Sequence, residues 1–126
     1  MPRLAASGEA VILNIGSTFG SIGHPGFSAY CASKFGLRGF SEALGRELAD
    51  TGIRVSYLAP RATRTSLNAP AVNALNDALG THSDSPEQVA AAVIRILRDG
   101  SRRRHLGWPE SFFAWLNQVV PAVVDR

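Results

Sequence analysis

Two short apolar segments with a helical pattern between them constrain the fold of this chain more than any other feature. Residues 9–15 and 53–58 are nearly continuous apolar runs rich in β-branched residues, which is typical of strands buried on both faces. Between them, apolar residues recur at helical spacing from Tyr30 to Leu48, and Thr51 and Gly52 end the pattern. Strand, helix and strand in this order predict a parallel crossover, so we expect an α/β fold with a parallel sheet.

The elements on either side of this unit are less regular. Residues 17–26 are rich in Ser and Gly and are expected to form a loop, after which Ser28 is predicted to cap the helix. A polar loop follows at residues 60–70, and then a weaker helix to about residue 79. Ser85 and Pro86 predict the start of another helix, which continues over residues 89–98. We expect a third, short strand at residues 104–107 and a last apolar helix over residues 109–125, interrupted by Pro121.

Length and composition limit the classes of protein to which the chain can belong. Its 126 residues, of which 45% are hydrophobic, are enough for one globular domain. The single cysteine, Cys31, excludes a disulfide framework and a cysteine-based metal site, and we expect it to be a small core residue. It also favours a reducing compartment, so a cytoplasmic location is predicted. No segment approaches the roughly 18 uninterrupted apolar residues that a membrane-spanning helix needs, and the beginning of the chain is unlike a secretion signal.

The basic residues carry one informative exception. The net charge is +3, but apart from three adjacent arginines at 102–104 the basic residues are scattered, so we predict no nucleic-acid partner. Of the 13 basic residues, 12 are arginine, and Lys34 is the one lysine. Because a compact ammonium on a flexible stem differs chemically from a planar guanidinium, Lys34 is a candidate for a specific chemical role.

Tyr30 and Lys34 together indicate acid–base chemistry. They stand four residues apart near the start of the predicted helix, so their side chains share one face. A nearby ammonium stabilises a phenolate, which makes the phenol a better proton donor and acceptor at the operating pH. Ser17 comes just after the end of the first strand, where its hydroxyl is placed to hydrogen-bond the same substrate oxygen. Each residue alone is more often structural, and it is the joint pattern that carries the prediction.

The order and spacing of these residues resemble the classical short-chain dehydrogenase/reductase family. The resemblance rests on the run from Asn14 to Ser17 after a strand, the Gly-rich loop, and the run from Tyr30 to Lys34 on a helix that leads to a second strand. It implies an NAD(P)-dependent oxidoreductase that interconverts a secondary alcohol and a carbonyl compound. It also implies that Tyr30 is the general acid/base, that Lys34 assists it and holds the nicotinamide ribose, and that Ser17 polarises the substrate oxygen.

The loop after the second strand extends the resemblance with changes. The family's usual Pro-Gly-x-x-x-Thr corresponds to residues 60–65, so the resemblance implies cofactor contacts at Pro60, Thr63 and Thr65. Arg61 replaces the glycine, and Thr63 stands at a position that is usually aliphatic. We further hypothesise that Arg61 or Arg64 contacts a cofactor phosphate. The sequence does not choose between NAD and NADP.

The glycines of this chain do not supply the family's dinucleotide fingerprint. Those at 16, 20, 23 and 26 do not fit G-x-G-x-x-G and follow the wrong strand. We therefore expect residues 1–126 to be a single incomplete domain, the carboxyl-terminal, catalytic half of a Rossmann-like, doubly wound parallel sheet with flanking helices. Such a half exposes a sheet edge, and cofactor binding by the chain alone is expected to be poor.

Several alternatives remain open. Family members form homo-oligomers, but this chain lacks part of the usual interface. The last helix has three candidate roles, which are docking on the other half of the domain, an oligomer contact and a peripheral membrane contact. A serine hydrolase based on Ser17 is disfavoured because Thr18 interrupts the nucleophile motif. A metal site at His24, His82 and His105 would draw on unrelated segments. The main functional alternative is a non-catalytic fragment that acts as a binding module or is inactive.

Overall fold

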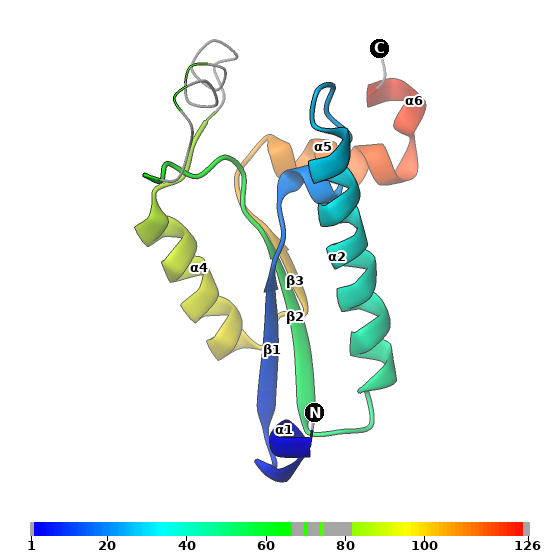
Figure 1. The fold of residues 1–126 in the computed structure, drawn as a ribbon, viewed down its shortest axis with the longest axis vertical. Coiled ribbons are helices and arrows are strands. Elements are labelled where there is room, and N and C mark those ends of the chain that lie inside the picture. The colour runs from blue at the N-terminus through cyan, green and yellow to red at the C-terminus, as the bar shows by residue number, and fades with distance from the viewer. Residues whose placement is uncertain (1, 67–69, 71–73, 75–81, 125–126) are drawn as a thin grey trace.

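Three parallel strands form the centre of the molecule. The structure is a computed structural model that describes residues 2–66, 70, 74 and 82–124. Strands β1 (Ala10–Ile15), β2 (Ile53–Ala59) and β3 (Arg103–His105) lie in the order β1-β2-β3, and both neighbouring pairs are parallel. The carboxyl ends of all three strands therefore lie at the same end of the sheet, which is the upper end in Figure 1. The predicted α/β class and the parallel crossover are confirmed.

Helices cover both faces of this sheet. Helix α2 (Ser28–Glu47) lies on one side and α4 (Pro86–Asp99) on the other, as Figure 1 shows. A short helix, α1 (Pro2–Ala6), precedes β1, and a 3-10 turn, η1 (Thr18–Gly20), follows it. Helices α5 (Glu110–Val119) and α6 (Pro121–Val124) come after β3, and Pro121 separates them as predicted. The arrangement is a partial Rossmann-like, doubly wound sheet.

The two long helices begin differently from each other. Ser85 caps α4 through a capping box, in which its side chain accepts from the Gln88 amide and its own amide donates to the Gln88 side chain. The prediction that Ser28 caps α2 is wrong. The helix begins one residue earlier than that prediction requires, so Phe27 is at the N-cap position and provides no side-chain hydrogen bond. Ser28 is already the first residue inside the helix.

The core has a layer on each side of β2. Leu58 faces α4 and packs with Ala92 and Ile96, all fully or nearly fully buried. On the other side, Val55 and Tyr57 face α2. Cys31, on α2, is buried as predicted, and its Sγ accepts from the His24 amide. Successive β2 side chains thus point to opposite faces, as a strand buried on both sides requires.

The outer strand and the last helices expose apolar surface. Val11 and Ile15 on β1, at the edge of the sheet, are each about 40% exposed. The exposed side chains after β3 include Trp108, Phe112, Phe113, Trp115, Val119 and Val120. Across the described ranges no helix combines the length and hydropathy that crossing a bilayer requires. The weak helix predicted up to residue 79 lies outside the described residues, apart from Pro70 and Ala74.

Candidate active site

The backbone after β1 is held against β2, and this places Ser17. The Gly16 amide donates to the Leu58 carbonyl oxygen at 2.7 Å, and the Thr18 amide donates to the Pro60 oxygen at 3.0 Å. Ser17 itself is extended, and its Oγ accepts from the Phe19 amide at 3.2 Å, which caps the turn η1. Ser17 therefore sits in a fixed backbone at the carboxyl end of the sheet.

The side chain of Tyr57 packs against this loop. The sequence analysis did not identify Tyr57 as a residue of the site. A Cβ on Gly16 would lie 2.1 Å from the Tyr57 Oη, and one on Gly20 would lie 2.7 Å from the same atom. The Tyr57 hydroxyl also donates to the Ser17 carbonyl oxygen at 3.5 Å. Burial raises the pKa of Tyr57, so this hydroxyl keeps its proton. The sequence did contain a signal for this contact, because Tyr57 is an aromatic residue late in the second strand and the first strand is followed directly by Gly16.

Tyr30 and Lys34 reach the same place from the first two turns of α2. The Lys34 Nζ donates to the Ile15 carbonyl oxygen at 3.3 Å, two residues before Ser17, and lies 5.6 Å from the centre of the Tyr30 ring. The Tyr30 ring meets the Phe19 ring edge-on and is 44% exposed. The structure thus brings all three predicted catalytic residues to the carboxyl end of β1. In Figure 1, α2 begins beside the loop that leaves this strand.

The loop after β2 borders the same end of the sheet. Pro60 is buried, and its carbonyl oxygen accepts from both the backbone and the side chain of Thr18. Thr63 pairs with Asp84 in an isolated parallel bridge, and Thr65 is exposed. The predicted cofactor residues Pro60 and Thr63 therefore stand on a loop that is tied to the Ser17 loop at one end and to the segment before α4 at the other.

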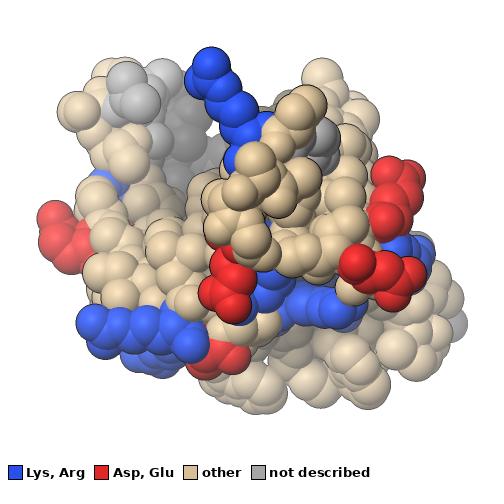
Figure 2. Space-filling view, turned by 90° about the horizontal axis from the view of Figure 1, so that it is seen from below, with Lys and Arg blue, Asp and Glu red and all other residues tan. Residues whose placement is uncertain are grey.

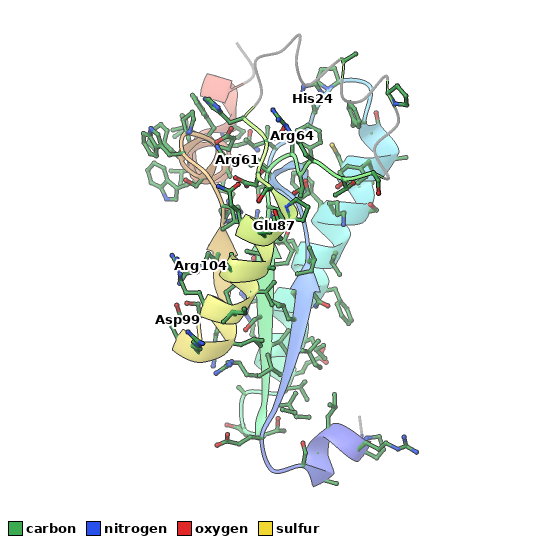
Figure 3. All side chains as sticks on the ribbon, turned by 90° about the vertical axis from the view of Figure 1, so that its left-hand side faces the viewer. His24, Arg61, Arg64, Glu87, Asp99 and Arg104 are labelled. Atoms are coloured by element: carbon green, nitrogen blue, oxygen red, sulfur yellow. The ribbon has the colours of Figure 1, made fainter. Side chains whose placement is uncertain are left out.

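The sequence suggested that Arg61 contacts a cofactor phosphate, but the structure shows two carboxylates as its partners. Its guanidinium pairs with Asp84 at 2.9 Å and with Glu110 at 3.5 Å, so it is engaged by two carboxylates instead of being free for a phosphate. The paired carboxylates raise the pKa of Arg61, the hydrogen bond to Asp84 contributing most. Figure 3 shows Arg61 and Arg64 at the end of the sheet where α4 begins.

A second cluster of polar side chains surrounds Ser21, the residue that follows the turn η1. The buried Ser21 hydroxyl meets the His105 Nε2 and the Arg38 guanidinium, each at 3.1 Å, while Asn117 of α5 donates to the Ser21 carbonyl oxygen at 2.8 Å. Burial lowers the pKa of His105, with the nearby arginines adding to the effect. His105 is therefore a structural partner of the loop. Within the part of the chain that is described, no group of three or more metal-ligating side chains occurs.

The opposite end of the molecule has a different character. An open groove there is lined by the start of β1 and by the ends of α2 and α4, including Val11, Leu48 and Leu97. Seen from this end in Figure 2, basic side chains lie beside acidic ones. The ion pairs of the described residues include Arg104 with Asp99 at 2.6 Å and Arg103 with Glu42 at 3.0 Å. None of the predicted catalytic residues lines this groove.

Comparison with known proteins identifies the family. Residues 1–76 match the family model described as short chain dehydrogenase. The chain belongs to the short-chain dehydrogenase family. Among curated members, it is 34% identical over 118 residues to the putative oxidoreductase SadH of Mycobacterium tuberculosis, covering 85% of this chain and 43% of SadH. It is 43% identical over 89 residues to carbonyl reductase family member 4 of Xenopus laevis, covering 68% of this chain and 37% of that protein.

Solved structures of short-chain dehydrogenases confirm the fold. One from Streptomyces avermitilis superimposes with a TM-score of 0.75 at 29% identity, covering 98% of this chain and 52% of that one. Another, from Burkholderia cenocepacia in complex with NADP, gives a TM-score of 0.78 at 20% identity, covering 98% and 48%. This short-chain dehydrogenase therefore spans about half the length of the relatives that it matches.

Proposed function

We propose that this short-chain dehydrogenase chain carries the catalytic half of an NAD(P)-dependent oxidoreductase that interconverts a secondary alcohol and a ketone or aldehyde. The observation that carries the proposal is the position of Lys34, whose Nζ bonds to the Ile15 oxygen and lies 5.6 Å from the Tyr30 ring. This position supports the proposal because the reaction needs an ammonium, a phenol and the Ser17 hydroxyl to act together at one end of the strand.

Each residue has a distinct task in this proposal. In the oxidative direction, the Ser17 hydroxyl and the Tyr30 phenol bind the substrate oxygen, and Tyr30 accepts the proton that leaves it. Lys34 stabilises the negative charge on the Tyr30 oxygen in that step. In the reductive direction the same proton returns from Tyr30 to the new alcohol. The 44% exposure of Tyr30 leaves its ring open to a small-molecule substrate.

The residues present fit a nicotinamide cofactor. An ammonium has three hydrogen-bond donors, and the Ile15 oxygen takes one donor of Lys34, so the others suit ribose hydroxyls. Pro60, Thr63 and Thr65 would hold the carboxamide side of the cofactor. When bound, the cofactor accepts or donates the hydride. NADP in the Burkholderia cenocepacia relative and in a serine dehydrogenase of similar fold supports a nicotinamide dinucleotide without choosing between NAD and NADP.

The first experiment is a fluorescence titration of the folded 126-residue chain with NADH and NADPH. Circular dichroism establishes folding, and the Lys34→Arg variant tests the role of the amine, because a guanidinium cannot occupy the same position with the same donors. Arg95→Ala, on the exposed face of α4, is the matched control. We expect weak, saturable binding that Lys34→Arg removes and Arg95→Ala preserves. Equal binding by all three chains would refute the assignment of Lys34.

A non-catalytic role is the second candidate, and the same titration tests it. A folded chain that binds neither nucleotide would act as a binding module or be inactive. Three expectations stay predictions. Cell fractionation on a density gradient tests the cytoplasmic location, and light scattering tests the homo-oligomer. Sedimentation with lipid vesicles tests a peripheral membrane contact through the last helix.

A further inference from the structure

Arg61 joins three segments that are far apart in the sequence. Its Nε and Nη2 both lie 2.9 Å from the Asp84 Oδ1, and its Nη1 lies 3.5 Å from the Glu110 Oε2. Arg61 belongs to the loop after β2, Asp84 to the segment before α4, and Glu110 to the first turn of α5. One guanidinium therefore links the loop that carries Thr63 to both of these segments.

The surroundings of this arginine are partly closed to solvent. The side chains of Arg61, Asp84 and Glu110 are 19%, 7% and 22% exposed, so water screens the charges less than at an open surface. Gly107, in the left-handed region with φ +84°, makes room for the arginine, because a Cβ there would lie 2.7 Å from the Arg61 Cδ. The site is thus shaped to the Arg61 side chain as well as charged to receive it.

The ion pair stands beside a short backbone ladder. The Arg64 amide donates to the Asp84 carbonyl oxygen at 3.0 Å, and the Asp84 amide donates to the Ala62 oxygen at 2.8 Å, which forms the bridge between Thr63 and Asp84. The side-chain pair and the backbone pair connect the same two segments. Arg61 and Asp84 therefore hold residues 62–64 at a fixed distance from the start of α4.

We propose that Arg61 is a positioning residue, which uses its ion pairs with Asp84 and Glu110 to hold the backbone of residues 62–64 in one conformation before a ligand binds. A glycine at this position has no side chain to tie the loop and more backbone freedom to lose on binding. A loop that is already ordered loses less conformational entropy when its ligand arrives. The inference rests on the proposed function only in taking residues 60–65 as the cofactor loop.

The direct test is amide hydrogen exchange of the ligand-free chain, measured residue by residue by NMR. The Arg64 and Asp84 amides report on the bridge, and the Gly16 amide, bonded to the Leu58 oxygen, is the internal reference. Arg61→Gly is expected to speed exchange at the two bridge amides at least about ten-fold and to leave the reference unchanged. Arg95→Ala, at an exposed position on α4, is the control and should leave all three amides unchanged. Bridge amides that exchange at the rate of an unprotected peptide in the wild-type chain would overturn the proposal.

A second variant removes Arg61 together with its nearly buried partner, so that the Asp84 carboxylate is not left unpaired. Arg61→Met combined with Asp84→Leu replaces the pair by apolar side chains, a change that usually preserves folding. We expect the melting temperature to stay close to that of the wild type while the Arg64 amide exchanges faster, because apolar contacts do not fix a direction as a paired guanidinium does. Wild-type exchange in this double variant would show that the ion pair does not position the loop.

Titration with NADH and NADPH then separates the two claims. If the wild-type chain binds, Arg61→Gly is expected to raise the Kd about ten-fold or more while Arg95→Ala, outside the proposed cofactor loop, leaves it unchanged. An unchanged Kd in Arg61→Gly would refute the positioning role even if the exchange results agree with it. If the wild-type chain binds neither nucleotide, the proposed function fails for this chain, and the exchange measurements still decide whether Arg61 orders the loop.

Discussion

The substitution Gly16→Ala tests whether close packing between Tyr57 and the loop after β1 builds the site. An added Cβ would lie 2.1, 2.2 and 2.3 Å from the Oη, Cζ and Cε2 atoms of Tyr57. Ordinary contacts between such atoms begin near 3.4 Å, so the ring and the loop must separate by about 1 Å. Tyr57 is only 2% exposed and its Oη also lies close to Gly20, so the ring has little room to move.

The cost is set by overpacking. Gly16 does not have a positive φ, so alanine is compatible with the backbone and the clash is the main penalty. Forcing a methyl group into a closed site costs about 3 kcal/mol, at the upper end of the range for overpacked cores. For a domain of this size that corresponds to a fall in Tm of roughly 10 °C. Because Ser17 is the next residue, the same substitution also displaces the proposed catalytic hydroxyl.

Urea unfolding followed by circular dichroism measures this cost. Gly23→Ala is the matched control, since a Cβ there has nothing within 4 Å and the residue lies in the same loop. The substitution Tyr57→Leu shortens the opposing side chain. In a chain that already carries Tyr57→Leu, adding Gly16→Ala should therefore lower the free energy of unfolding by less than it does in the wild type. A Gly16→Ala chain as stable as the Gly23→Ala chain would refute the packing argument.

Three further predictions concern stability. Burial lowers the pKa of His105 from its ordinary 6.5, so the unfolded chain takes up this proton more readily than the folded chain. The contribution of His105 to the free energy of unfolding is therefore complete above about pH 6.5 and is lost as the pH falls. Urea midpoints should drop between about pH 7.5 and pH 5.5, and His105→Gln should reduce that drop. Ser85→Ala removes the cap of α4 and should cost about 1 kcal/mol in urea unfolding, and an unchanged midpoint would contradict the capping role. Gly39→Ala, in the middle of α2 with nothing within 4 Å of the new Cβ, should add about 0.5–1 kcal/mol, and a lower Tm would contradict the open space seen there.

Local patterns in the sequence predicted most of the fold. The apolar runs of β1 and β2 and the capping box at Ser85 are signals carried by neighbouring residues, so they were visible without the structure. The cap predicted at Ser28 was wrong because the helix includes Ser28 as its first residue, and a shift of one position is beyond what a local pattern resolves. The third strand was expected at residues 104–107 and lies at Arg103–His105 for the same reason.

Long-range pairings were beyond reach of the sequence. Arg61 and Asp84 are 23 residues apart, and no periodicity connects them, so the sequence indicated an unusual arginine but not its partner. The packing of Tyr57 under Gly16 depends on the register in which β1 and β2 pair, which sets Asn14 beside Tyr57. The spacing of Tyr30 and Lys34 predicted that they share a face, whereas the bond from Lys34 to the Ile15 oxygen needed the crossing of α2 over the sheet.

The most direct test of the central claim uses the two halves of the cofactor separately. Chemical shifts of the backbone amides are recorded while the 126-residue chain is titrated with reduced nicotinamide mononucleotide and, in a separate sample, with adenosine monophosphate. The account predicts shifts at residues 15–17, 30–34 and 60–65 with the nicotinamide probe, and none of this pattern with the adenosine probe. Shifts confined to other parts of the chain, or no response to the nicotinamide probe, would contradict the claim that Ser17, Tyr30 and Lys34 form a nicotinamide-dependent catalytic site.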